Sequence, residues 1–199
     1  MLRPGDQGEA VLALQQRLTE LGYWLGQPDG KWGHLTTQAV YAIQKAAGIG
    51  RDGVAGPAVR QALADGVRPQ PRNGGTGVEI DLKRQILLVV RDGAVTHTLN
   101  TSTGSNKPYE EVYEGRTYRG PSTTPPGQFR VFREVDKLDK GPLGALWRPK
   151  YFNGGIAVHG SASIPPTNVS HGCARVSNAA MDMIWANGYM PINGRVSVY

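Results

Sequence analysis

Apolar residues recur every three or four positions through the first third of the chain, which is the spacing of one face of an α-helix. One such set covers residues 11–21 and a second covers residues 35–47, and a glycine follows each set at once, as is common where a helix ends. A third run follows Pro57, and proline suits the first position of a helix. The pattern predicts a small domain of three short helices over residues 1–66.

The same region contains a weak internal repeat. Asp29-Gly30 and Asp52-Gly53 each open a D-G-x-x-G sequence directly ahead of a predicted helix. An Asp-Gly pair permits the positive φ that a tight turn needs. We therefore expect the second and third helices to have similar entries.

The pattern changes after residues 67–76, a stretch rich in Pro and Gly without apolar periodicity. Such a composition is typical of a linker and permits independent motion of the two halves. From residue 77 to residue 199, short runs rich in β-branched residues alternate with turn residues, including the two-residue hairpin turn Asp92-Gly93.

The strands expected in this second half lie at 78–82, 86–91, 94–101, 128–135, 156–159, 173–176 and 195–199. One helix, capped by Ser177 or Asn178, is expected to run to about Asn187 and to pack on the strands. The predicted fold class is α+β. A small all-α three-helix domain precedes a β-rich, sandwich-like domain at 77–199, with a partly open barrel as the alternative.

Charge and composition narrow the choice of partners only slightly. The chain carries 22 Lys and Arg against 16 Asp and Glu, a net charge of +6, which favours an anionic partner or simply a soluble basic surface. The basic residues are scattered and no zinc-finger or RNA-binding motif is present, so we expect no nucleic acid partner. No stretch approaches the roughly 20 apolar residues of a membrane-spanning helix. The N-terminus lacks the apolar core of a secretory signal.

The residues best suited to chemistry lie at 156–176, a segment with two of the four histidines and the only cysteine. A cysteine nucleophile needs a base, a group that orients the base, and N–H donors for the oxyanion. His159 ends an apolar strand, and Gly160 leaves a backbone carbonyl accessible to orient its ring. Cys173 follows a glycine that can turn successive N–H groups toward one point. The candidate oxyanion donors are the N–H groups of His171, Gly172 and Cys173.

Two other interpretations of these residues stay open at this point. Cysteine is among the most buried residue types, so Cys173 alone also fits a small core residue. His159, His171 and Cys173 are metal-binding residue types, but their spacing fits no common short zinc motif and no fourth ligand is near in sequence. We therefore expect no metal and no cofactor.

The motif taken as a whole resembles the signature of the L,D-transpeptidase catalytic domain. It reads H-G at 159–160 and S-H-G-C-A-R at 170–175. The sequence T-P-P-G-Q-F at 124–129 resembles a strand entry of the same family, and G-R-V-S-V at 194–198 resembles its closing strand. The resemblance covers about residues 77–199.

This resemblance implies a peptidoglycan acyltransferase. In that family a cysteine attacks the carbonyl between meso-diaminopimelate and D-alanine of a tetrapeptide stem, releases D-alanine, and passes the acyl group to an amine of another stem. The resemblance makes Cys173 the nucleophile, His159 the base and acid, and Gly160 the group that orients the histidine. His171 and Gly172 are then expected at the oxyanion donors.

Two further roles follow from the same resemblance. Ser170 is expected to hydrogen-bond within the motif loop, and Arg175 is expected either to contact substrate or to form a structural salt bridge. Covalent inhibition by carbapenems at Cys173 is implied as well. A wall enzyme acts outside the cytoplasm, in the cell wall or periplasm, so we expect an export signal that this sequence does not include.

The first domain resembles the three-helix peptidoglycan-binding module. The form L-x-x-G-x-x-G-x-x-V-x-x-L-Q-x-x-L-x-x-L-G-Y runs over residues 2–23, and D-G-x-x-G-x-x-T-x-x-A-V runs over residues 29–40. The resemblance implies peptidoglycan as the partner, both stem peptide and glycan. Tyr23, Trp24 and Trp32 are candidates to stack on sugar rings, although aromatic residues at such positions are more often core.

Three functions are consistent with the sequence: a transpeptidase, an L,D-carboxypeptidase or amidase-like hydrolase that uses water as the acceptor, and a non-catalytic wall-binding protein. The intact cysteine and histidine pair disfavours the third. Exclusion of water depends on the segments 104–123 and 164–167, which are predicted to be loops that form a lid. Tyr109, Tyr113 and Tyr118 in the first of these loops are candidate contacts for a stem peptide.

Overall fold

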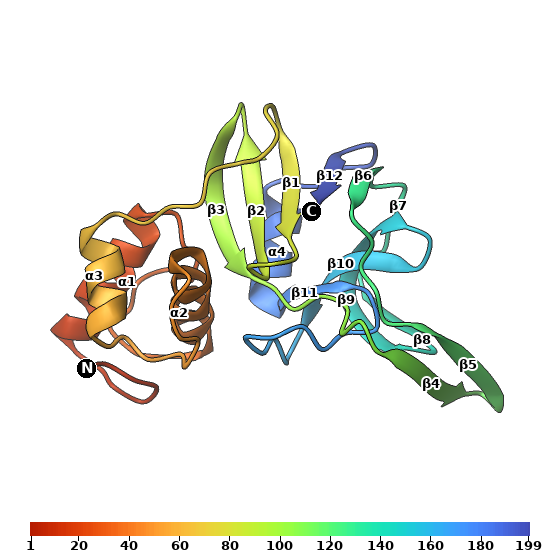
Figure 1. Cartoon of the computed structure of the whole chain (residues 1–199), viewed down its shortest axis with the longest axis horizontal. Helices are drawn as coiled ribbons and strands as arrows, with labels where there is room; N and C mark the ends of the chain where they lie inside the picture. Colours follow the sequence, from red (N-terminus) through yellow and green to blue (C-terminus); the bar gives the residue numbers. More distant parts are fainter.

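The computed structural model describes all 199 residues and has three helices in the first third of the chain (Figure 1). These are α1 (Glu9–Glu20), α2 (His34–Ala47) and α3 (Pro57–Ala64). Their apolar faces meet in one core that includes Val11, Leu18, Val40, Ile43 and Val59. Gly48 ends α2 with a left-handed φ of 67°, a conformation that glycine adopts without strain. The predicted three-helix domain is confirmed.

A buried glutamine holds each of the two Asp-Gly turns that the sequence repeats. The Gln15 side chain accepts hydrogen bonds from the N–H groups of Asp29 and Gly30, at 2.9 and 2.8 Å. The Gln44 side chain accepts from the Gly53 N–H at 3.0 Å. Because these glutamines lie on α1 and α2, each turn is fixed to the helix that precedes it. The similar helix entries predicted from the repeat are present.

The remainder of the chain forms two sheets, a separate hairpin and one helix. The strand order is β3-β2-β1-β12-β6 in the first sheet and β11-β10-β9-β7 in the second, where β8 also pairs with β9. All neighbours are antiparallel except β1 with β12 and β10 with β11, which are parallel.

The strands of the first sheet are β1 (Gly77–Asp81), β2 (Ile86–Arg91), β3 (Ala94–Asn100), β6 (Gly127–Arg130) and β12 (Arg195–Val198). Those of the second are β7 (Arg133–Glu134), β8 (Leu138–Gly141), β9 (Gly144–Asn153), β10 (Ile156–Ser161) and β11 (Ala174–Ser177). The hairpin consists of β4 (Pro108–Tyr113) and β5 (Arg116–Pro121), and the helix is α4 (Asn178–Ala186).

The main core lies between the two sheets, and α4 packs into it. Its fully buried members come from both sheets and from the helix, and they include Ile80, Leu87, Val158, Val176, Met181 and Ile184. The Ser177 hydroxyl accepts a hydrogen bond from the Ala180 N–H at 3.1 Å and caps α4, as one of the two predicted caps. The predicted α+β fold with a sandwich-like second half is confirmed.

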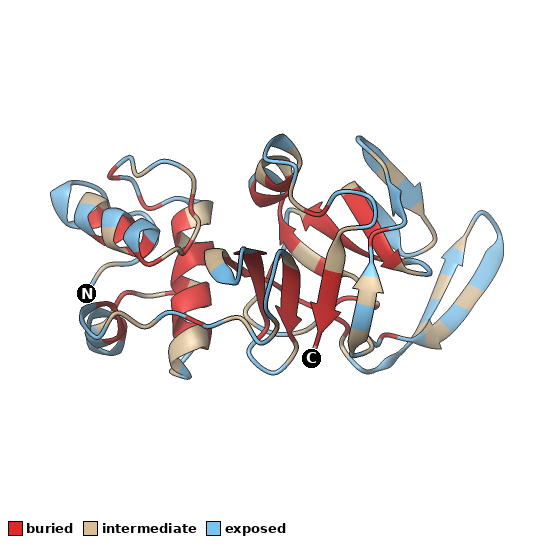
Figure 2. Cartoon of the chain, turned by 90° about the horizontal axis from the view of Figure 1, so that it is seen from above, coloured by how far each residue is buried: buried red, intermediate tan, exposed pale blue.

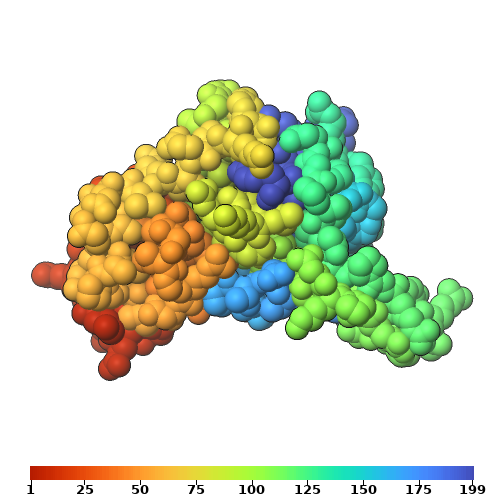
Figure 3. All heavy atoms as spheres, viewed as in Figure 1, coloured from red at the N-terminus to blue at the C-terminus, as the bar shows by residue number.

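Predictions for the middle of the chain are wrong in three places. Segment 104–123, predicted as a loop, contains the β4–β5 hairpin, which projects from the body of the molecule with mostly exposed residues (Figures 2 and 3). The strand predicted at 128–135 is two short strands, β6 and β7, in different sheets. Residues 138–153, where the sequence predicts no strand, form β8 and β9. These segments are polar or interrupted by Gly and Pro, so they lack the periodicity of a half-buried strand.

The two halves of the chain are docked through α2, which packs on β2 and β3 (Figure 1). The Lys45 ammonium is buried at this interface and donates to the carbonyl oxygens of Gln85 and Thr101, each at 2.9 Å. The start of the linker is also held, because the Tyr23 hydroxyl donates to Val67 O at 2.8 Å. The two halves are therefore joined by a direct polar contact as well as by the linker.

Lys45→Met tests this contact, because methionine keeps an apolar stem and removes the ammonium. Oxygen acceptors on Gln85, Asn100 and Thr101 would lose their buried donor, which costs about 1–3 kcal/mol. We expect a lower midpoint of urea unfolding and faster proteolysis within residues 67–76. Lys31→Met is the matched control, since Lys31 is exposed. An equal loss in both variants would contradict the role of Lys45.

Candidate active site

Parallel pairing of β10 with β11 brings the candidate residues of the motif together. In this register His159 lies opposite Arg175, and Cys173 immediately precedes β11. All three residues line one open cavity of about 570 Å³. The histidine and the cysteine singled out in the sequence therefore belong to one site.

The His159 ring is held by the backbone of its neighbour. His159 is 6% exposed, and its Nδ1 lies 2.8 Å from Gly160 O. Because a carbonyl oxygen can only accept, Nδ1 carries the proton and Nε2 keeps a free lone pair. Burial lowers the pKa of His159 to about 4, with the Arg175 charge acting in the same direction and the Gly160 hydrogen bond opposing it. The ring is thus neutral at neutral pH, with Nε2 able to accept a proton.

The Cys173 thiol is half-buried beside the start of β10. Its Sγ accepts from the Ala157 N–H at 3.4 Å and lies 3.7 Å from Gly155 O. Burial raises the pKa of this thiol, while the Ala157 N–H and the Arg175 charge partly offset the effect. The resting pair consequently consists of a neutral thiol and a neutral imidazole.

Ser170 fixes the turn that precedes Cys173. Its hydroxyl donates to Cys173 O at 2.5 Å and accepts from the Gly172 N–H at 3.1 Å. Gly172 O accepts from the hydroxyl of Thr124, at 2.6 Å, so the T-P-P-G-Q-F segment supports the same turn. The Gly172 N–H is therefore engaged, and the prediction of three free oxyanion donors is corrected to two. The N–H groups of His171 and Cys173 have no partner in the protein.

The Arg175 guanidinium also lines the cavity, and no ion pair of the chain includes it. Burial lowers the pKa of Arg175, and the nearby Cys173 opposes that shift. The structural salt bridge that was one of its two predicted roles is not formed. Its charge is available to a ligand in the cavity.

The β4–β5 hairpin forms one outer wall of the site. Tyr109 and Tyr118 line the cavity, and the Tyr109 ring packs on the His171 ring with centroids 5.1 Å apart. His171 Nε2 lies 3.4 Å from the Glu111 carboxylate on the same hairpin. The tyrosines were candidate substrate contacts in the sequence analysis, but Glu111 was not. Its partner, His171, lies 60 residues further along the chain, so the sequence does not indicate the contact.

Residues 139–146 and Tyr151 form another wall of the cavity, and the sequence did not indicate it. The Tyr151 hydroxyl donates to Asp139 at 2.8 Å. The second segment predicted as a lid, 164–167, does not line the cavity. Ile164 is buried, and its carbonyl accepts from the Asn100 side chain at 3.0 Å. That part of the lid prediction is wrong.

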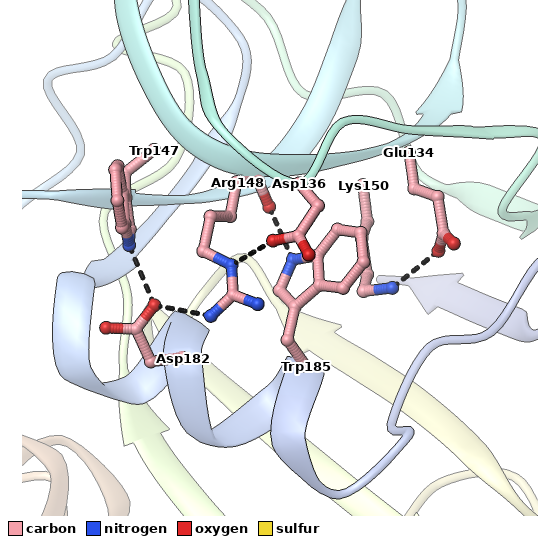
Figure 4. Close-up of polar contacts among 7 residues, drawn as sticks. All are labelled: Glu134, Asp136, Trp147, Arg148, Lys150, Asp182 and Trp185. Carbon is pink, nitrogen blue, oxygen red and sulfur yellow. Dashed lines mark hydrogen bonds and ion pairs between the residues drawn. The ribbon is translucent and has the colours of Figure 1, made fainter.

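Next to the site, a polar network joins β9 to α4 (Figure 4). The Asp182 carboxylate accepts from Trp147 Nε1 and from the Arg148 guanidinium, both at 2.8 Å. Trp185 Nε1 donates to Arg148 O at 2.8 Å, and the buried Lys150 ammonium lies 3.7 Å from the centre of the Trp185 ring. These contacts fix the central part of β9 on the helix.

Gly160 packs closely against this same region. A Cβ at Gly160 would lie 2.7 Å from Asn178 Oδ1 and 2.8 Å from Trp147 Cδ1, both too close for a real side chain. The glycine is therefore needed for β10 to approach β9 and α4. Because Gly160 O also holds the His159 ring, a shift of the backbone at Gly160 would move the ring as well.

Two of the three aromatic residues considered for contact with sugar rings are buried in the first domain. Tyr23 is 0% exposed and Trp32 is 6% exposed, and both belong to the helical core. Trp24 is partly buried and packs against the core of the sandwich. Of the two interpretations that the sequence left open, a core position is therefore the one that fits Tyr23 and Trp32. No helix of the chain is both long and apolar enough to span a membrane. No group of three His, Cys, Asp or Glu side chains lies close enough together to hold a metal ion.

Comparison with known proteins divides the chain in the same two parts. Residues 75–197 match the L,D-transpeptidase catalytic domain and residues 7–63 match a peptidoglycan binding domain. These matches define the class, a two-domain peptidoglycan protein. Because the first match covers more than half of the chain, the chain belongs to the L,D-transpeptidase family.

Solved structures agree with this assignment. The crystal structure of an L,D-transpeptidase from Xylanimonas cellulosilytica is 52% identical, with a TM-score of 0.93, and the match covers 99% of this chain and 96% of that one. An L,D-transpeptidase from Stackebrandtia nassauensis is 23% identical, with a TM-score of 0.54 over 100% of this chain and 95% of that one, and shares the fold.

A curated relative matches about a third of the chain. The N-acetylmuramoyl-L-alanine amidase CwlL of Bacillus licheniformis is 47% identical over 66 residues, which is 32% of this chain. The chain spans 18% of the length of that relative.

Proposed function

We propose that this chain is a peptidoglycan L,D-transpeptidase in which Cys173 is the nucleophile and His159 is the base. The observation that carries the proposal is the His159 ring, held by Gly160 O with a free lone pair on Nε2, in the same cavity as the Cys173 thiol. Family membership and the 52% identical L,D-transpeptidase support the substrate class.

In the first half-reaction the thiol proton passes to His159 Nε2 while Sγ of Cys173 attacks the carbonyl carbon before the terminal D-alanine. Burial favours the neutral form of both groups, and His159 Nε2 is the acceptor for the thiol proton. The N–H groups of His171 and Cys173 are placed to stabilise the oxyanion. The carbon–nitrogen bond then breaks, His159 returns the proton to the leaving amine, and a thioester remains on Cys173.

In the second half-reaction an amine of another stem attacks the thioester carbon. The carbon–sulfur bond breaks, an amide forms, and Cys173 recovers its proton through His159. Water in place of the amine would give an L,D-carboxypeptidase and a tripeptide product. Transfer to an amine and hydrolysis by water both follow the same first half-reaction and use the same residues in it.

Arg175 and Ser170 support these steps without taking part in bond making. The guanidinium of Arg175 is free of any protein carboxylate and suits a carboxylate of the stem peptide. Ser170 holds the turn that carries the two free N–H groups. We assign Arg175 to substrate binding and Ser170 to maintaining the shape of the oxyanion site.

We assign residues 1–66 to wall binding, residues 67–76 to the linker and residues 77–199 to catalysis. The contact through Lys45 would hold the active site at a fixed place relative to the bound wall. Peptidoglycan lies outside the cytoplasm, so the cell wall or periplasm is the proposed location.

Analysis of products by mass spectrometry after incubation with disaccharide-tetrapeptide tests the proposal. Dimers joined through diaminopimelate support a transpeptidase, and tripeptide alone supports hydrolysis. Unchanged tetrapeptide would contradict both activities.

The pH dependence of D-alanine release tests the role of His159 as base. The imidazole must be neutral to accept the thiol proton, and burial lowers its pKa to about 4. We therefore expect kcat/KM to stay flat from neutral pH down to about pH 5 and to fall through about pH 4. Circular dichroism at each pH checks that the chain remains folded. An acid limb centred at the ordinary histidine value of 6.5 would show that another group, or a differently placed His159, controls the rate.

A further inference from the structure

A basic groove lies where the end of α2, the linker and the β1–β2 turn meet. Its volume is about 590 Å³, and none of its residues lines the cavity that contains Cys173. In Figure 3 the orange end of α2, the yellow linker and the yellow-green β1–β2 turn lie side by side. We call this space the junction groove. The charged side chains that line it are Lys45, Arg51, Arg72, Asp81, Lys83 and Arg84.

Most of the positive charge in the junction groove has no carboxylate partner. Five of the six charged residues are cations, and the sixth, Asp81, pairs with Arg84 at 3.5 Å. No other ion pair of the chain includes a residue of the groove. Glu79, which the Tyr199 hydroxyl contacts at 3.0 Å, is fully buried and does not line the groove. The groove therefore lacks the negative charge that would balance its cations.

Two of these cations are guanidinium groups that the fold holds in place. Arg51 is half-buried, and its Nη1 donates to Pro166 O at 3.2 Å. The Arg72 guanidinium lies over the Tyr199 ring, 4.8 Å from its centre. Stacking uses the flat face of a guanidinium and leaves the N–H groups at its edge available. Guanidinium groups held in this way suit phosphate oxygens, which they bind through paired hydrogen bonds.

The junction groove continues into a smaller space of about 150 Å³ on the second domain. The two spaces share Arg51 and Lys83. The smaller space has no carboxylate in its lining, which is mostly polar and uncharged and includes Thr103, Asn106 and Asn168. A path that is longer than one small ion and carries cations along it complements a linear polyanion.

Lys45 supports the same conclusion from inside the domain contact. Its ammonium is buried, and its acceptors are the uncharged oxygens of Gln85, Asn100 and Thr101. Burial and, to a smaller extent, the Arg51 charge lower the pKa of Lys45 to about 7. An anion bound beside Arg51 would oppose this shift and favour the ammonium form. It would thereby favour the contact that joins the two halves of the chain.

We propose that the junction groove binds a linear polymer of alkyl phosphodiesters, with successive phosphates against Arg51, Arg72 and Lys83. Such a polymer carries one charge on each short repeat, so several charges fit into a space of this size. Tyr199 is the only aromatic residue that lines either space, and Arg72 covers its ring. Because nucleic acid strands depend on stacking of bases on aromatic side chains, a backbone without bases fits the groove better.

Binding of fluorescent poly(glycerol phosphate) to the full-length chain, measured by anisotropy at several salt concentrations, tests this inference. For a flexible phosphate polymer, the logarithm of the affinity falls with the logarithm of the salt concentration by about 0.7 for each phosphate contacted. Three contacts give an expected wild-type slope of about −2. For the double variant Arg51→Gln/Lys83→Gln we expect a slope of about −0.7 and about tenfold weaker binding.

The double variant Lys31→Gln/Arg60→Gln is the matched control, since it removes the same charge from exposed positions outside the groove. It should bind poly(glycerol phosphate) as the wild type does. The single variant Lys83→Gln changes only an exposed side chain and should lower the slope by about 0.7. It keeps the test valid if thermal melting shows that the double variant of the groove is unfolded.

Three outcomes would overturn the assignment. Equal weakening in the two double variants would show that net charge, and not the junction groove, determines binding. Soluble glycan strands with tetrapeptide stems are a second ligand, and if the groove variant loses affinity only for these strands, the groove binds peptidoglycan. Tighter binding of single-stranded oligothymidine than of poly(glycerol phosphate) would identify a nucleic acid site. The anisotropy measurement does not need the transfer reaction, so a chain without transpeptidase activity would contradict the proposed function and not this inference.

Discussion

Cys173→Ala is expected to abolish D-alanine release from a tetrapeptide stem, by more than about a thousandfold. The alanine variant has no atom that can attack the carbonyl carbon, and no other cysteine exists in the chain to replace it. The fold should survive, because the thiol is half-buried and makes only two long contacts, to Ala157 N–H and Gly155 O. Product analysis by mass spectrometry measures the loss, and binding to isolated sacculi should persist through residues 1–66.

Cys173→Ser is the matched variant for this experiment. Serine keeps the size and the polar contacts of the side chain, but its hydroxyl is far less acidic than a thiol and His159 would have to remove a much more tightly held proton. We expect this variant to be nearly as inactive as the alanine variant. A carbapenem should add its mass to the wild type and to neither variant. D-alanine release that persists in Cys173→Ala would identify a different nucleophile.

Features that depend on neighbours in the sequence could be predicted from it. The helical domain followed from apolar spacing and from glycines that end its helices. The contact between His159 Nδ1 and Gly160 O joins adjacent residues, so a histidine at the end of an apolar strand was enough to suggest it.

β9 and the two strands of the β4–β5 hairpin were not predicted because their composition is unusual for strands. β9 contains Pro149, and Arg148 has a φ of 49°, so neither fits a regular strand. Lys150 is buried on the same strand, which is compatible with folding because Glu134 pairs with it at 2.6 Å and the Trp185 ring packs on it. The hairpin strands are mostly exposed and polar, and their pairing with each other, not burial, makes them strands.

Contacts between segments far apart in the chain could not be predicted from the sequence either. The sequence could not show that Arg175 lacks a carboxylate partner or that Glu111 meets His171. Each of these findings changes an assigned role, since each decides which polar groups of the site remain free for a ligand.

The placement of His159 depends on such a distant contact, through Gly160. Gly160, whose carbonyl oxygen holds the ring, also packs closely against β9 and the start of α4. Asp182 holds Trp147 in position on the other side of this contact. The base is therefore positioned by three segments of the chain, of which only one contains the recognised motif.

Gly160→Ala tests this dependence and is expected to lower kcat by about a hundredfold, the loss typical of a reacting group displaced by about 1 Å. The added methyl group would lie 2.7 Å from Asn178 Oδ1 and 2.8 Å from Trp147 Cδ1, so the backbone at 160 must move and the His159 ring must follow its carbonyl. Steady-state release of D-alanine measures the effect, with kcat falling more than KM rises because stem binding does not use the ring.

Gly74→Ala is the matched control, since a Cβ there meets no atom within 4 Å and the position does not line the cavity. It should leave kcat unchanged. Thermal melting of both variants separates misplacement of the base from general unfolding, because a folded but slow Gly160→Ala chain is the expected result. Wild-type kcat in Gly160→Ala would show that the close packing of β10 against β9 and α4 does not determine the position of His159.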